Sequence, residues 1–122
     1  FIGSPITPDN MKAILIDTIN RQVREVELPK GDNKAIYALL GEGTELMEGA
    51  VRFDNNDIIM VDEEGHFNPK TGCITFDGSH PFMGSGLVLG GTDEGGSADV
   101  KATVAEIRAK VAFGLLLPKD LF

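Results

Sequence analysis

The sequence predicts an α+β fold in which an antiparallel, twisted sheet of five to six strands packs against two helices. Short apolar runs separated by turn residues recur from residue 12 to residue 92, as in strands joined by tight connections. One early and one late segment instead carry apolar residues at helical spacing. The 122 residues are enough for one domain, and their 42% hydrophobic and 25% charged content is typical of a globular protein.

The first half of the predicted sheet begins with two strands and a short helix. Strands are expected at Lys12–Asp17, a buried apolar run, and at Arg21–Leu28, where apolar residues alternate with glutamates. Asp32 then stands in position to cap a helix over Asn33–Leu40. The helix ends before two glycines, so we expect it to be short and to follow the second strand directly.

Four further strands are expected after this helix. The first two are Leu46–Phe53 and Asp57–Asp62, and the Asp-Asn-Asn-Asp turn between them contains residues that tolerate left-handed backbone conformations. This pattern predicts a hairpin. Cys73–Phe76 is expected as a fifth strand and Leu87–Thr92 as a sixth.

A longer C-terminal helix is expected from residue 104 to the glycine at position 114. Thr103 and Glu106 have the spacing of a capping box at its start. Val104, Ile107 and Val111 form an apolar stripe along it. We therefore expect this helix to pack across one face of the sheet.

The domain is expected to cover residues 11–114. Phe1–Asn10 contains prolines and short polar residues without periodicity, which favours a disordered upstream extension or an expression remnant, with Met11 as the native start. Residues 115–122 are expected to form an apolar C-terminal tail.

Charge and composition limit the partners and the compartment. There are 19 acidic and 11 basic residues, which give a net charge of −8, and the basic residues form no cluster. Binding to nucleic acid or to an anionic membrane is therefore not expected, because both need concentrated positive charge. The sequence has no apolar run of the roughly 20 residues that span a membrane. The single Cys73 is consistent with a reducing cytoplasm, where we expect the protein to act.

Four segments together resemble a known family. They are Met11–Asp17, Val61–Gly65, Gly86–Gly90 followed by Thr92–Gly95, and the predicted closing helix. In their order they resemble the small proteins of phages, plasmids and other mobile elements that are grouped as domain of unknown function 3846. The resemblance spans roughly Met11 to Phe113, with an extra Gly91 and the residues beyond 114 as departures. It implies a small cytoplasmic protein from mobile DNA, and it implies no activity, substrate or catalytic residue.

The sequence predicts no metal, no cofactor and no catalytic residue. His66, Cys73 and His80 are three ligands at wide spacing, whereas structural zinc sites usually take four close together. Ser85 or Ser97 with a histidine forms no nucleophile elbow. The acidic residues at 62–64 lie at a turn, where solvent opposes the pKa shift that acid–base catalysis needs.

The glycine-rich turns on either side of the strand at 87–89 are the candidate recognition surface. Six glycines lie within the thirteen positions from 84 to 96, which indicates unusual backbone angles or a close approach by another chain or ligand. The alternative is that these glycines only permit tight turns beside a closely packed helix. The candidate ligand- or partner-binding residues are Phe82, Met83, Gly84, Ser85, Gly86, Gly90, Gly91, Asp93 and Glu94.

The leading functional interpretation is a non-enzymatic binding or interaction module of a mobile element, whose partner is another protein or a second copy of the chain. The alternative is a binder of a small ligand or nucleotide derivative, with the glycine-rich turns lining its pocket. A small hydrolase that uses the loop acids is the third hypothesis.

Overall fold

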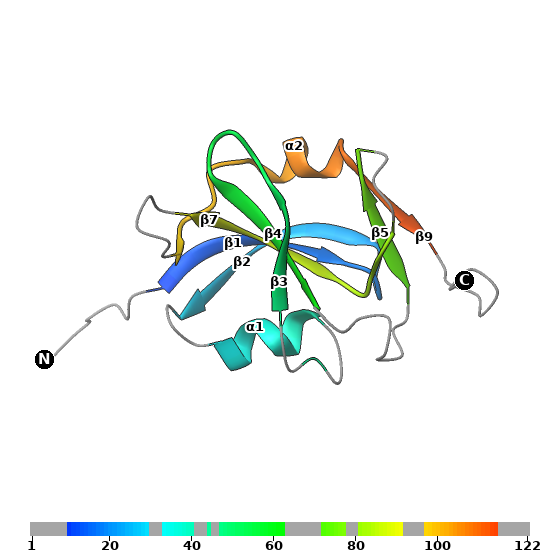
Figure 1. Ribbon diagram of the computed structural model, residues 1–122, viewed down its shortest axis with the longest axis horizontal. Helices are drawn as coiled ribbons and strands as arrows, with labels where there is room; N and C mark the ends of the chain where they lie inside the picture. The colour runs from blue at the N-terminus through cyan, green and yellow to red at the C-terminus, as the bar shows by residue number, and fades with distance from the viewer. Residues whose placement is uncertain are drawn as a thin grey trace, which may run out of the picture.

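The computed structural model describes residues 10–29, 33–40, 44, 47–62, 72–77, 81–91 and 97–114. Over these residues the fold is mostly β, with nine strands and two short helices (Figure 1). In chain order the elements are β1 (Asn10–Asp17), β2 (Gln22–Pro29), α1 (Asn33–Leu40), β3 (Met47–Arg52), β4 (Asp57–Asp62), β5 (Cys73–Phe76), β6 (Phe82–Met83), β7 (Gly86–Gly91), β8 (Ser97–Ala98), α2 (Val104–Arg108) and β9 (Val111–Gly114).

The main sheet is antiparallel and has the strand order β2-β1-β7-β4-β3. Val88 at its centre lies between Ile14 of β1 and Ile59 of β4. This central position explains why every residue of β7 is buried and why its sequence is apolar on both faces. The two-residue β8 pairs with the end of β7.

A second, three-stranded antiparallel sheet has the order β6-β5-β9, which corrects the expectation of one sheet. The strand at 73–76 forms with the predicted bounds, but it pairs with residues 111–114 instead of joining the main sheet. Its Ile74 side chain packs directly over Gly86 of β7, where a Cβ would come within 2.8 Å. The small sheet therefore lies against one face of the large one.

The main sheet is covered on both faces. On one face, α1 packs through Ile36 and Leu40 onto Leu15 and Leu87 of the sheet. On the other face, α2 and the small sheet enclose a second cluster that includes Ile107. Figure 1 shows the resulting layers, with α1 below the main sheet and α2 above it.

The prediction of a long C-terminal helix is wrong. Helix α2 ends at Arg108, and Val111–Gly114 forms β9 instead. Of the predicted apolar stripe, Ile107 is buried, and the half-buried Val104 and Val111 pack against the same core. Its last member reaches that core from a strand, because pairing with β5 competes with the helix and β-branched and aromatic residues fit a strand well.

Several local predictions are confirmed. Helix α1 and strands β4 and β5 have the predicted bounds, and Asn56 in the hairpin turn has a φ of 74°. Asn10, expected in the extension, is the first residue of β1 and pairs with Pro29. The remainder of the extension and the tail at 115–122 lie outside the described residues. Neither described helix has the length and apolar composition needed to cross a membrane.

Candidate functional site

A buried carboxylate joins the β3–β4 turn to the segment that leads into α2. The residue Asp57 is fully buried at the start of β4. Its Oδ2 accepts a hydrogen bond from the backbone N–H of Ala102 at 2.8 Å, and its Oδ1 accepts one from Lys101 at 3.0 Å. The side-chain amide of Asn55 donates to Oδ2 at 3.1 Å. Hydrogen bonds to an ionised acceptor are among the stronger ones. Asp57 therefore holds the β3–β4 turn close to residues 101 and 102, which precede α2.

Each side of this junction is also fixed by its own local structure. In the turn, the N–H of Phe53 donates to the carbonyl of Asp57 at 2.8 Å, and the left-handed Asn56 closes the loop. At α2, Thr103 and Glu106 form the predicted capping box, with hydrogen bonds of 3.2 and 2.9 Å in the two directions. Local hydrogen bonds therefore hold both sides of the junction in addition to those that the Asp57 carboxylate accepts.

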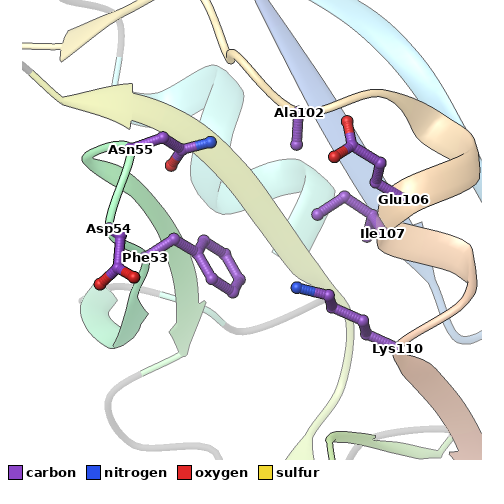
Figure 2. A pocket seen from close by; sticks show the side chains of 7 residues that line it. All are labelled: Phe53, Asp54, Asn55, Ala102, Glu106, Ile107 and Lys110. Atoms are coloured by element: carbon purple, nitrogen blue, oxygen red, sulfur yellow. The ribbon is translucent and has the colours of Figure 1, made fainter.

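A shallow cavity of about 260 Å³ lies between the turn and α2 (Figure 2). Phe53, Asp54 and Asn55 line it from the turn. Its other wall is formed by Ala102, Glu106, Ile107 and Lys110. The cavity thus combines apolar side chains with charged and amide groups, so it can offer both burial and orienting polar contacts.

Phe53 is the aromatic centre of this cavity. Its ring packs against Phe76 with centroids 5.1 Å apart and an interplanar angle of 55°. The ammonium of Lys110 lies over the same ring, 5.5 Å from its centroid. Figure 2 shows this ammonium pointing toward the ring, while the carboxylate of Asp54 turns away from it at the edge.

The candidate residues of the glycine-rich turns lie mainly inside the fold. Phe82 is half-buried in β6, and the described members that follow it are buried. Gly84 has a φ of 84°, a conformation that favours glycine. Asp93 and Glu94 lie outside the described residues, as do His66 and His80. In the structure, residues 82–86 lie at the start of β7 and residues 90–91 at its end. Their role in recognition stays a prediction.

Close contacts within the chain surround three of these glycines, and a Cβ on Gly91 would lie 2.7 Å from the carbonyl oxygen of Asn56. A Cβ on Gly90 would collide with the backbone carbonyl oxygen of Asp99, the residue that follows β8. A Cβ on Gly86 would meet the end of the Ile74 side chain at 2.8 Å. Gly90 and Gly91 therefore need glycine for a close approach of backbone within the chain itself, whereas the flexible end of Ile74 at Gly86 can shift.

Ser85 and Asp17 belong to polar clusters around the β1–β2 turn. The hydroxyl of Ser85 accepts a hydrogen bond from the N–H of Thr18 at 3.0 Å. Burial of the Asp17 carboxyl opposes its ionisation, but hydrogen bonds from the side chains of Asn20 and Arg24 and from the N–H groups of Asn20 and Ile19 outweigh this effect. They hold the Asp17 pKa below its ordinary value of 3.8. Both clusters stabilise the turn.

The sequence contained the parts of the cavity but not their juxtaposition. The hairpin turn and the capping box were both recognisable, yet Phe53 and Lys110 are distant in the chain and meet only in the folded structure. The excess of acidic residues gave no indication that Asp57 would be buried. Among the described residues, no group of three or more His, Cys, Asp or Glu side chains is arranged to hold a metal.

Comparison with known protein families, with curated proteins and with solved structures finds no match for this chain.

Proposed function

We propose that the chain is a non-enzymatic binding module that recognises a protein partner at the cavity between the β3–β4 turn and α2. The observation that carries this proposal is the position of Asp57. One buried carboxylate holds Asn55 on one wall and Ala102 on the other, at 3.1 and 2.8 Å. A site fixed in this way loses little conformational entropy when a partner binds, which favours affinity.

The composition of the cavity supports recognition of a polypeptide. Phe53 offers a half-buried aromatic ring, and aromatic side chains contribute strongly to protein interfaces. Asp54 and Glu106 add negative charge to the cavity and Lys110 holds an ammonium over the Phe53 ring, so the cavity can discriminate between charged groups of a partner. The mobile-element origin that the family resemblance implies remains part of this proposal.

Selection of peptides followed by mapping of their contacts tests the proposal. A random peptide library displayed on phage is selected on the full chain, and the retained peptides are titrated into 15N-labelled protein. We expect the amide resonances of Asn55, Ala102 and Lys110 to shift most. Matched Phe53→Leu and Phe82→Leu variants compare the cavity with the glycine-turn surface, and we expect only the first to weaken binding, by about tenfold or more.

Two results would contradict this function. One is that no retained peptide shifts the cavity resonances. The other is that the shifts cluster at residues 82–86 and that Phe82→Leu, but not Phe53→Leu, abolishes binding. The second result would favour the glycine-rich turns as the recognition surface. Unfolding curves of both variants, measured in parallel, separate lost binding from lost stability.

A further inference from the structure

We propose that the cavity receives an arginine side chain from a basic segment of the partner protein, at the place that the ammonium of Lys110 occupies in this structure. This inference rests on the proposed function and specifies the chemistry of the partner. It follows from three features of the cavity: the ring of Phe53, the ability of the Lys110 side chain to move away from this ring, and the charge of the lining residues.

The ring of Phe53 is already used as a cation site. Its face carries the Lys110 ammonium at 5.5 Å, within the distance at which a cation is attracted by an aromatic quadrupole. The contact with Phe76 holds the ring in this orientation. A guanidinium is better suited to the same place than an ammonium, because it is planar, stacks on aromatic rings and is more weakly hydrated.

Lys110 is able to leave this place. It lies in the turn between α2 and β9, and the residue is exposed. Its backbone is fixed independently of the side chain, because its N–H donates to Ile107 and its carbonyl accepts from Asp77. The long side chain can therefore move into solvent without unfolding the turn, and a cation–π contact at an exposed site opposes this movement only weakly.

The charge of the site selects a cation over an anion. Two carboxylates, Asp54 and Glu106, and one ammonium, Lys110, line the cavity, so its ionised side chains sum to −1. The sum becomes −2 once the lysine moves away. The net charge of −8 on the whole chain also attracts a basic segment and repels an acidic one. Lys110 thus acts as an internal competitor that occupies the site until a stronger cation arrives.

The test uses two peptides that differ only in charge. Acetyl-Gly-Arg-Gly-amide and its citrulline analogue, a neutral isostere, are titrated separately into the 15N-labelled full chain. We expect the arginine peptide to shift the resonances of Asn55, Ala102 and Lys110, and the citrulline peptide to bind at least several-fold more weakly. Raising the salt concentration should weaken the binding of the arginine peptide but not that of the citrulline peptide.

Removal of the internal competitor gives the distinguishing result. Lys110→Met keeps an unbranched side chain one atom shorter and without the charge, and we expect this variant to bind the arginine peptide about two- to fivefold more tightly. Lys34→Met is the matched control. It makes the same change in net charge on α1, on the opposite face of the main sheet, and we expect little change in affinity.

The inference is overturned if Lys110→Met binds the arginine peptide no more tightly than Lys34→Met does, or if the citrulline peptide binds equally well. The proposed function survives either result when library-selected peptides still shift the cavity resonances. If neither the arginine peptide nor any selected peptide shifts them, the inference and the proposed function both fail.

Discussion

The guanidinium of Arg108 donates a hydrogen bond to the backbone carbonyl of Val23, over 3.2 Å and across 85 residues of sequence. Arg108 is the last residue of α2, and Val23 lies in β2, at one edge of the main sheet. A helix of five residues is too short to be stable by itself in water. Its position therefore depends on such contacts with the sheet and on the burial of Ile107.

Truncation of Ile107 should destabilise the protein strongly. This side chain is 2% exposed in the core between α2 and the main sheet. Ile107→Ala is expected to lower the free energy of unfolding by about 2–4 kcal/mol, through lost burial and the remaining cavity. Urea unfolding measures the effect, with Ile19→Ala as control, because Ile19 is 68% exposed and its truncation should change stability by less than about 0.5 kcal/mol. Equal effects of the two substitutions would reject this packing of α2.

Replacement of Asp57 by asparagine should also destabilise the fold. The amide keeps the shape of the side chain. One of the two carboxylate oxygens, which accept hydrogen bonds from N–H groups, becomes an NH₂ group that can only donate. Asp57→Asn is expected to lower the free energy of unfolding by about 2–4 kcal/mol, because buried donors lose a charged acceptor. Asp54→Asn, three residues earlier and exposed, is the control, with an expected change of less than about 0.5 kcal/mol. A fully stable Asp57→Asn variant would show that this carboxylate does not hold the α2 segment.

Two glycines of β7 should differ in their tolerance of alanine. At Gly90 the obstacle is the backbone carbonyl of Asp99, whereas at Gly86 it is the flexible end of Ile74. Gly90→Ala is therefore expected to cost at least about 3 kcal/mol or to prevent folding, and Gly86→Ala about 1–3 kcal/mol. Circular dichroism during thermal unfolding compares the two. A Gly86→Ala variant less stable than Gly90→Ala would contradict the packing explanation.

The contribution of Asp17 to stability should disappear in acid. Because folding lowers the pKa of this carboxyl below 3.8, the folded state favours the ionised form. The stabilisation is therefore fully present above the pKa of the unfolded chain and is lost as the pH falls through the lower folded pKa. Urea unfolding between pH 7 and pH 2 should show wild type more stable than Asp17→Asn above about pH 5, with the difference shrinking below about pH 4.

The salt bridge to Arg24 provides a check on this pH dependence. Its guanidinium lies 2.8 Å from the Asp17 carboxylate and helps to lower the pKa. In an Arg24→Met variant the folded Asp17 pKa is lowered less, so the acid-dependent loss of stability should be smaller than in wild type and should be complete at a higher pH. A difference between wild type and Asp17→Asn that stays constant down to pH 2 would exclude this assignment.

Local physics in the sequence determined the elements that form from neighbouring residues. Helical spacing with flanking glycines specified α1, and the Asp-Asn-Asn-Asp turn specified the β3–β4 hairpin, in which Asn56 takes the left-handed conformation. The capping box at Thr103 was also readable, since both of its hydrogen bonds join residues three positions apart. Such patterns depend on interactions within a few residues, which the order of the chain displays directly.

Only the tertiary structure decided what residues 111–114 become and where the cavity forms. The apolar stripe from Val104 to Val111 fits a helix, but pairing of Val111 with Phe76 makes the last part a strand. Likewise, Asp57 reaches the backbone of Ala102 across 45 residues, and no periodicity encodes that meeting. Strand pairing and the hydrogen bonds of a buried carboxylate are stabilised by partners far along the chain. The conformation of residues 111–114 and the position of the cavity are therefore determined only when those partners come together.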